Sequence, residues 1–304
     1  MTTAFVLSGG GSLGAVQVGM LAALPDLLLG TSVGALNAAY LGANGFDTDT
    51  IDRLATVWRR IRRSDVFPID PLRGALALAG RRPSLCSPDP LRRLVEANLP
   101  LRDMEDARIA VNVVATDVMS GEEALLSSGD ATSAVLASAA IPAVFPAVER
   151  EGRVLMDGGV ANNTAVSQAV ALGAERIVVL PAGFACALTA PPVTALAAAM
   201  HALTLLIEQR LIVEIADLTN RSEIIVLPPL CPLSVSAIDF GATDELMSTA
   251  RRTAGEWLDS GRHHLAHPER FLSLHGHRWA QGCRHHEREA APIPSLAQQD
   301  KEIA

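Results

Sequence analysis

Lysine, aromatic residues and cysteine are all scarce in this sequence of 304 residues. Lys301 is the only lysine among 25 basic residues, and aromatic side chains make up 4% of the chain. The four cysteines lie far apart and include no C-x-x-C pair, so they offer no disulfide framework. Such usage is typical of free thiols in a reducing compartment, and we therefore expect a cytoplasmic protein; the cysteines are Cys86, Cys186, Cys231 and Cys283.

Long apolar runs are absent too. No stretch of 18 apolar residues occurs without interruption, so the sequence predicts no membrane-spanning helix. The longest apolar stretch, residues 193–207, contains Thr194, His201 and Thr204, and we interpret it as a buried or lid helix. The N-terminus has no basic region ahead of an apolar run, so we expect no signal peptide.

The net charge of −8 argues against nucleic acid as the main partner. The charge is unevenly distributed, because residues 53–108 contain 12 arginines but only 7 acidic residues. Solvated helix faces are the interpretation that we favour for these arginines, and a basic rim that contacts an anionic membrane surface is the alternative. The arginine doublets are Arg59-Arg60, Arg62-Arg63, Arg81-Arg82 and Arg92-Arg93.

A G-x-S-x-G pattern at Gly30, Ser32 and Gly34 stands between an apolar run and a helical pattern. This spacing is typical of a nucleophile elbow, in which a serine occupies a tight strand-to-helix turn and its neighbours must be small. The helix that starts near Val33 would direct its free N–H groups towards an anion formed there. The pattern is short and common, so alone it also fits an ordinary strand–turn–helix junction.

A glycine-rich loop follows the first expected strand and contains Gly9, Gly10, Gly11, Ser12 and Gly14. The N–H groups of such a loop form a concave site for an anion, either a phosphate or the oxyanion of a tetrahedral intermediate. The spacing also fits the dinucleotide fingerprint G-x-G-x-x-G. That fingerprint requires an acidic residue at the end of the second strand, where this sequence has Ser32, so the nucleotide interpretation is the weaker one.

These two motifs together resemble those of the patatin-like phospholipase family. Three further stretches match that family in the same order, namely a central strand, a small-residue helix with a proline turn, and a D-G-G motif, at residues 112–117, 137–146 and 157–164. The resemblance covers about residues 4–180, and five motifs in order are far more specific than any one of them. It implies a three-layer α/β/α fold with a mostly parallel central sheet.

The resemblance also implies a Ser–Asp dyad that cleaves carboxylic ester bonds of lipids through an acyl-enzyme, without a metal ion or another cofactor. Ser32 would be the nucleophile and Asp157 the base that takes its proton. N–H groups of Gly10 and Gly11, with Gly9 and Ser12 adjacent, would form the oxyanion hole. Further glycines would support these motifs: Gly14, Gly30, Gly34, Gly158 and Gly159.

The sequence around Asp157 supports a catalytic role independently. Asp157 follows the apolar run 153–156, so it lies at a strand end, and the two glycines after it permit an open turn. Because Asp–Gly is a common turn pair, a turn aspartate is the alternative. Asp117, at the end of the expected strand 109–116, is the rival carboxylate.

Seven of the eight histidines lie at or after His263, where they could complete a Ser–Asp–His triad. Ser32 follows only the second expected strand, which is very early for that kind of hydrolase. A metal site with Cys283 is weakly supported, because no second pair of ligands is present. The alternatives to a hydrolase are a nucleotide- or phosphate-binding module and a patatin-like protein with little turnover.

Apolar runs alternate with helical patterns as far as residue 260, which predicts a mostly parallel sheet with helices on both faces. We interpret residues 1–270 as one acyl hydrolase domain and residues 271–304 as a polar, mobile tail. Strands are expected at residues 3–8, 26–29, 109–116, 153–156, 176–180 and 222–227. Helices are expected at residues 15–24, from 33, and at 47–61, 87–99, 163–172, 194–218 and 243–260.

Two connections stand out. Residues 64–84 are punctuated by proline and glycine, and we interpret them as a surface connection or a loop over the active site. The first helix would end near Leu24 and the next strand would begin by Leu27, although parallel crossovers normally need a loop there. Either this connection is cramped, or the sequence lacks a loop that family members have.

Overall fold

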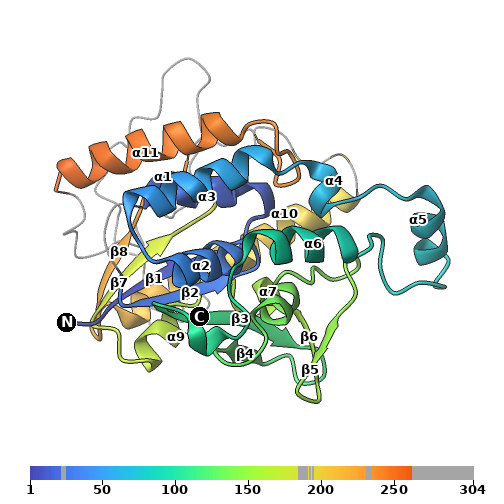
Figure 1. Cartoon of the computed structure of the whole chain (residues 1–304), viewed down its shortest axis with the longest axis horizontal. Coiled ribbons are helices and arrows are strands. Elements are labelled where there is room, and N and C mark those ends of the chain that lie inside the picture. The colour runs from blue at the N-terminus through green and yellow to red at the C-terminus, as the bar shows by residue number, and fades with distance from the viewer. Residues whose placement is uncertain (22–24, 184–190, 192, 194, 231–234, 262–304) are drawn as a thin grey trace, which may run out of the picture.

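One twisted sheet of eight strands organises the computed structural model, which describes residues 1–21, 25–183, 191, 193, 195–230 and 235–261 (Figure 1). Its strand order is β5-β6-β3-β2-β1-β7-β8, and β4 also pairs with β3. Strands β3, β2, β1, β7 and β8 are parallel, whereas β4, β5 and β6 run antiparallel to their neighbours. The strands are β1 (Thr3–Leu7), β2 (Leu27–Thr31), β3 (Ala110–Asp117), β4 (Glu123–Leu126), β5 (Val148–Arg150), β6 (Arg153–Asp157), β7 (Arg176–Leu180) and β8 (Glu223–Val226).

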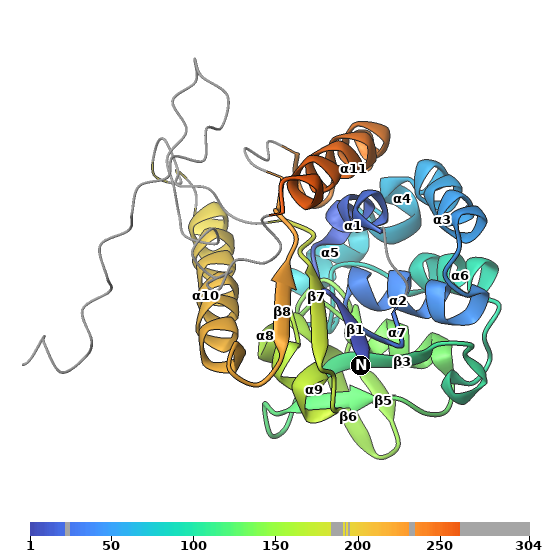
Figure 2. The ribbon, with the colours of Figure 1, turned by 90° about the vertical axis from the view of Figure 1, so that its left-hand side faces the viewer.

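Helices cover both faces of this sheet, so the mostly parallel α/β/α architecture expected from the sequence is confirmed (Figure 2). The helices are α1 (Gly14–Met20), α2 (Val33–Asn44), α3 (Thr48–Arg60), α4 (Arg63–Val66), α5 (Pro71–Leu78), α6 (Asp89–Asn98), α7 (Ala131–Ser138), α8 (Gly159–Asn162), α9 (Val166–Ala171), α10 (Ala195–Leu218) and α11 (Thr243–Asp259), with short 3-10 turns η1 (Gly11–Leu13) and η2 (Met104–Asp106).

Alternating side chains of the central strands create the two cores. Ala4 and Val6 of β1 pack in one cluster with α9 and α10, whereas Phe5 and Leu7 pack in the other with α1, α2, α3 and α11. Figure 2 shows α10 on one side of the sheet and α2 and α3 on the other. Because successive residues of a strand face opposite sides, each parallel strand must be apolar throughout, as the runs in the sequence are.

Several boundaries differ from the sequence predictions. Helix α1 ends at Met20, where Leu21 turns to an extended backbone, so the crossover to β2 is longer than expected and includes residues 22–24, which lie outside the described residues. Helix α9 starts at Val166 because the short helix α8 precedes it. The expected tail, residues 271–304, also lies outside the described residues.

Residues 64–84, interpreted from the sequence as a surface connection or a loop over the active site, contain helix α5 and part of α4, neither of which has a buried residue. The side chain of Asp70 accepts a hydrogen bond of 2.9 Å from the N–H of Arg73, and Pro71 stands in the first turn. An aspartate cap followed by proline is a start signal for a helix. The proline therefore marks the beginning of α5 and not a break in the chain.

A buried chain of polar side chains joins the helices on the α2 side of the sheet. Trp58 Nε1 donates to Asn37 Oδ1 at 2.9 Å, and Asn37 Nδ2 donates to Gln17 Oε1 at 2.9 Å. Gln17 Nε2 in turn donates to the carbonyl of Ser8, at the start of the glycine-rich loop, at 2.8 Å. Asn37 and Gln17 are fully buried, so each of these groups depends on its partner.

We expect Asn37→Leu to lower the free energy of unfolding by about 2–4 kcal/mol, because it leaves the Trp58 N–H and a Gln17 oxygen buried without partners. Urea denaturation followed by circular dichroism measures this. Asn44→Leu, on the same helix, is the matched control, since Asn44 Nδ2 donates to the carbonyl of Tyr40 one turn back and not to another buried side chain of the described residues. Equal unfolding midpoints for the two variants would contradict the importance of the buried chain.

Candidate active site

Strands β2 and β6 meet end to end along one edge of β3. Val114 of β3 pairs with Thr31, the last residue of β2, and Ala115 pairs with Asp157, the last residue of β6. Strand β4 pairs with both Val114 and Ala115, so β2 and β6 share the opposite edge. Because β2 is parallel and β6 antiparallel to β3, their carboxyl ends converge there. Ser32, which directly follows Thr31, therefore lies beside Asp157.

Ser32 occupies the apex of the turn between β2 and α2. Its φ of 53° and ψ of −118° are rare for a residue with a side chain and cost about 1–3 kcal/mol. Two contacts hold the turn: the N–H of Ser32 donates to Ser138 Oγ at 2.7 Å, and the Ser32 carbonyl accepts from the N–H of Ala35 at 3.0 Å. The Ser138 hydroxyl donates to the carbonyl of Val114, so the turn is tied to β3.

Two glycines of this region leave no room for a side chain. A Cβ atom on Gly34 would lie 2.1 Å from the carbonyl oxygen of Leu7, and one on Gly158 would lie 2.1 Å from that of Val114. The turns around Ser32 and Asp157 therefore pack directly on the backbones of β1 and β3. The remaining glycines predicted to support the motifs are equally crowded. At each of them a Cβ atom would lie within 3.0 Å of another atom; they are Gly14, Gly30 and Gly159.

Asp157 is a buried carboxylate, 7% exposed, at the end of β6. Its Oδ1 accepts a hydrogen bond of 2.7 Å from the N–H of Gly159. Burial raises the pKa of Asp157 to about 6, while hydrogen bonds from the Gly159 N–H and the Ser32 hydroxyl act in the opposite direction. No ion pair to Asp157 occurs in the described part of the chain. The group is thus ionised at neutral pH yet basic enough to accept a proton.

The rival carboxylate, Asp117, serves the turn after β3. It accepts hydrogen bonds from Arg153 Nε at 2.7 Å and from the N–H groups of Met119 and Ser120 at 2.9 and 3.2 Å. These bonds, chiefly the one from Arg153, lower its pKa. An ion-paired carboxylate of this kind is a weak base, and its hydrogen bonds join it to the turn and not to Ser32.

The glycine-rich loop lies against Ser32. A Cβ atom on Gly9 would come within 3.2 Å of the Ser32 Cβ atom and within 2.3 Å of Asn163 Oδ1. The Gly9 N–H donates to the carbonyl of Asn163 at 3.2 Å, and Asn163 Nδ2 donates to the carbonyl of Gly9 at 3.4 Å. The loop after β1 is thereby joined to the segment that follows Asp157, and both border the serine.

The four residues predicted for an oxyanion hole differ in the use of their N–H groups. Gly9 donates as described above, and the N–H of Ser12 donates to the carbonyl of Ala237 at 2.8 Å. No acceptor for the N–H groups of Gly10 and Gly11 is found among the described residues. Gly11 also has a φ of 57°. The available donors of the loop are therefore those of Gly10 and Gly11.

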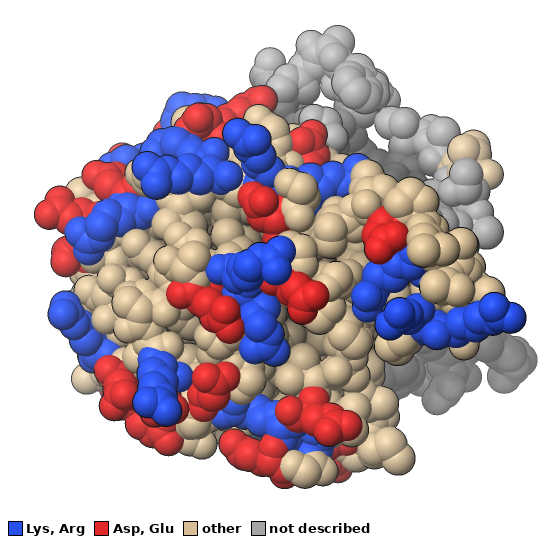
Figure 3. Space-filling model, turned by 45° about the vertical axis from the view of Figure 1, so that its right-hand side comes forward, with Lys and Arg blue, Asp and Glu red and all other residues tan. Residues whose placement is uncertain are grey.

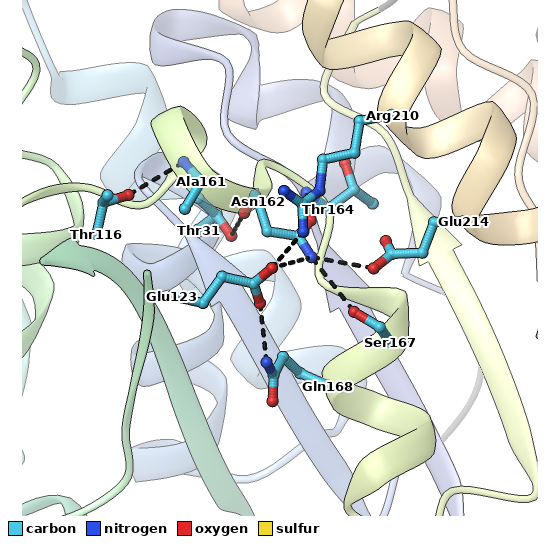
Figure 4. Close-up of polar contacts among 10 residues, drawn as sticks. All are labelled: Thr31, Thr116, Glu123, Ala161, Asn162, Thr164, Ser167, Gln168, Arg210 and Glu214. Carbon is cyan, nitrogen blue, oxygen red and sulfur yellow. Dashed lines mark hydrogen bonds and ion pairs between the residues drawn. The ribbon is translucent and has the colours of Figure 1, made fainter. Parts of the chain in front are cut away.

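A polar network supports the site from the α10 side (Figure 4). The Thr31 hydroxyl donates to the carbonyl of Asn162 at 3.2 Å, and Asn162 Nδ2 donates to Glu123 Oε1 and to Glu214 Oε1, each at 3.1 Å. Glu123 also forms an ion pair with Arg210. Figure 4 shows the Asn162 side chain between these acidic groups. The network thus joins β4, α8 and α10 to one another and to Thr31, the residue that precedes Ser32.

Sequence reasoning missed three supporting residues. Ser138 lies within the stretch matched to the family, but nothing in that pattern indicated that its hydroxyl would bond to the Ser32 N–H. Thr116 Oγ1 donates to the carbonyl of Asp157 at 2.9 Å and accepts from the N–H of Ala161 at 3.1 Å. These contacts, and those of Asn162, join positions far apart in the sequence, so no local signal could have found them.

The histidines at and after His263, like Cys283, lie outside the described residues. Within residues that are described, no group of three or more His, Cys, Asp or Glu side chains is arranged to hold a metal ion. None of the described helices is long and apolar enough to cross a bilayer.

The fold and the strained turn at Ser32 define an α/β/α protein with its candidate site at the carboxyl ends of parallel strands. The chain belongs to the patatin-like phospholipase family, whose family model matches residues 5–170. That match includes both Ser32 and Asp157.

Curated relatives cover the same part of the chain. Patatin-like phospholipase domain-containing protein 6 of Mus musculus is 27% identical over 190 residues, which are 60% of this chain and 14% of that protein. Patatin-like phospholipase domain-containing protein 7 of Rattus norvegicus is 29% identical over 188 residues, which are 59% of this chain and 13% of that protein. Lysophospholipase NTE1 of Pyricularia oryzae is 25% identical over 191 residues, 59% of this chain and 12% of that protein. The chain therefore spans only a small part of these relatives.

Among solved structures, VipD from Legionella pneumophila aligns with a TM-score of 0.45 and 16% identity. The alignment covers 85% of this chain and 67% of that structure.

The raised pKa of Asp157 makes stability depend on pH. The folded protein keeps the Asp157 proton up to about pH 6, whereas the unfolded chain releases it near the ordinary value of 3.8, so stability from this group falls as pH rises through that interval. Asp157→Asn removes the effect. We expect its free energy of unfolding, relative to wild type, to rise by up to about 3 kcal/mol between about pH 4 and about pH 8.

Urea titrations at both pH values measure this difference. Asp117→Asn is the control, because the pKa of Asp117 is lowered and its stabilisation persists as pH rises. A constant offset between Asp157→Asn and wild type would contradict the raised pKa.

Proposed function

We propose that the chain is a serine lipid acyl hydrolase, of the phospholipase A, lysophospholipase or esterase type. The observation that carries this proposal is the juxtaposition of Ser32 and the buried carboxylate of Asp157 beside neighbouring positions on β3. Asp157 has no cation partner among the described residues, and burial raises its pKa to about 6. Membership of the patatin-like phospholipase family and a relative named lysophospholipase support a lipid ester as the substrate.

In the proposed reaction, Asp157 takes the proton of Ser32 as the serine oxygen attacks the ester carbonyl. The N–H groups of Gly10 and Gly11 stabilise the oxyanion of the tetrahedral intermediate, and the partial positive charge at the start of α2 adds to this. Collapse of the intermediate breaks the ester bond, and the departing alcohol takes the proton from Asp157. Water then hydrolyses the acyl-enzyme, with Asp157 again as base, and restores Ser32.

The environment of Asp157 fits this role. A base that must work near neutral pH is most effective when its pKa lies near that pH, and burial brings the pKa of Asp157 to about 6. Since no cation holds it in the described residues, the carboxylate is free to become neutral when it takes the proton. The strained turn presents the Ser32 oxygen at a fixed place, which reduces the entropy lost on reaching the transition state.

We also propose a cytoplasmic location with peripheral contact to membranes. Cys86, the one cysteine among the described residues, is a free thiol, and burial raises its pKa, as for a structural cysteine in a reducing compartment. The surplus of arginines between residues 53 and 108 supports contact with an anionic lipid surface.

Labelling with a fluorophosphonate probe, together with hydrolysis of p-nitrophenyl esters, tests the proposed dyad. We expect the wild type to label on Ser32, and Ser32→Ala to lose labelling and at least about 10³-fold in kcat. Asp157→Asn should lose about 10²–10⁴-fold in kcat, because the serine then has no base. Asp117→Asn is the control and should keep most of the activity.

A wild-type protein that neither labels nor hydrolyses any ester would overturn the hydrolase proposal. Binding of phosphate or a nucleotide by the glycine-rich loop would then favour a binding module, and the absence of both would favour a patatin-like protein with little turnover.

The pH dependence gives a second test. Because Asp157 must be ionised to act as base, kcat/KM for a soluble ester should rise with pH and level off above a midpoint of about pH 6. Initial rates across the acid range measure it. A profile that is flat through this range, with the protein still folded, would contradict Asp157 as the base.

A further inference from the structure

Helix α5 projects from the body of the protein between α4 and α6 (Figure 1). None of its residues is buried, although it consists largely of leucine and alanine. We use the name α5 arm for residues 69–83. Three of its four large apolar side chains are among the most exposed in the described structure: Leu72 is 72%, Ile69 75% and Leu78 85% exposed, whereas Leu76 is half-buried.

The α5 arm presents apolar side chains to solvent. Arg73 Nη2 donates to the hydroxyl of the buried Ser84 at 3.1 Å, so Arg73 is directed to the protein, and Leu76 and Ala77 are half-buried with it. Leu72, Ala75 and Leu78, spaced three residues apart, are exposed and share the solvent-facing side. An exposed apolar face on an outlying helix indicates a surface that is covered in use.

The charges around the α5 arm indicate the chemistry of what covers it. Residues 59–93 contain nine arginines but only three acidic residues, in a chain whose net charge is −8. Arg81 and Arg82, at the end of the arm, are exposed, and neither forms an ion pair in the part of the chain that the structure describes. Figure 3, in which the right-hand side of Figure 1 comes forward, shows a group of basic side chains towards the right. Such a surface complements an anionic one.

The base of the arm lies at the edge of the candidate site. The N–H of Leu85 donates to the carbonyl of Ala143, and the N–H of Cys86 to that of Val144, both at 2.8 Å. The same loop provides the carbonyl of Ala140, which accepts from the N–H of Asp157 at 2.9 Å. The arm is therefore joined, through the segment that follows it, to the loop that also bonds to the backbone of Asp157.

We propose that the α5 arm docks the protein on bilayers that contain anionic phospholipids. The side chains of Leu72 and Leu78 enter the boundary between headgroups and acyl chains, and Arg81 and Arg82 bind the anionic headgroups. The inference rests on the proposed function only in naming a lipid surface as the place of the reaction. Docking itself requires neither Ser32 nor Asp157.

Sedimentation with vesicles tests the docking, using phosphatidylcholine alone or with phosphatidylserine, and the Ser32→Ala chain so that no lipid is consumed. We expect binding to the anionic vesicles only. The pair Leu72→Ser and Leu78→Ser, and the pair Arg81→Gln and Arg82→Gln, should each weaken that binding about tenfold or more. The arginine pair should lose its effect at high salt, where surface charges are screened.

Matched controls come from helices on other parts of the surface. The pair Leu206→Ser and Val213→Ser removes exposed apolar side chains from α10, and the pair Arg251→Gln and Arg252→Gln removes an exposed doublet from α11. Both control proteins should bind anionic vesicles like the parent. Since no changed side chain is buried, thermal unfolding should be the same for all of them.

Hydrolysis separates this inference from the proposed function. In the chain that keeps Ser32, arm variants should hydrolyse a soluble ester at the wild-type rate but lose hydrolysis of phospholipid in anionic vesicles. If no ester is hydrolysed at all, the sedimentation result still decides the docking. Equal vesicle binding by arm and control variants would overturn it. So would a change of molecular mass in solution caused by the leucine pair without a change in vesicle binding, which would assign the arm to contacts between copies of the chain.

Discussion

A strand has only two edges, and the site depends on how the edges of β3 are shared. Strand β4 occupies one edge at Val114 and Ala115, and on the other edge the end of β2 meets the end of β6. Ser32 and Asp157 are far apart in the sequence, yet backbone hydrogen bonds to adjacent residues of one strand set their separation. A rigid strand in the middle of the sheet thus acts as the template for the pair.

Forming this pair costs stability in two ways. Ser32 adopts a strained backbone, and Asp157 is a carboxylate removed from water without a cation beside it among the described residues. Neighbouring groups offset both of these costs in stability. Ser138 fixes the serine turn to β3, Gly34 and Gly158 pack against strand backbones, and the network around Asn162 joins the helices behind the site. Such local costs are typical of reactive sites in otherwise consistent folds.

Much of the architecture could be predicted from the sequence, and the reasons are physical. Strands buried on both faces appear as apolar runs, and small residues at strand–helix turns marked the regions of Ser32 and Asp157. The short strands β4 and β5 carry too few residues for a periodic signal. Helix α5 was missed because proline and glycine suggested a break, although Asp70 provides a cap. Contacts such as those of Ser138 and Asn162 depend on tertiary structure alone.

The long connection from β2 to β3 carries α2, α3, α4, α5 and α6 as a single stretch of chain. The glycine-rich loop precedes this stretch and Asp157 follows it, so the nine arginines of residues 59–93 are encoded between these two parts of the candidate site. Insertions or replacements in this part of the gene can alter the outer surface of the protein while the pairing of β2 and β6 with β3 stays the same. Evolution can therefore give such a protein a new outer surface without altering the arrangement of Ser32 and Asp157.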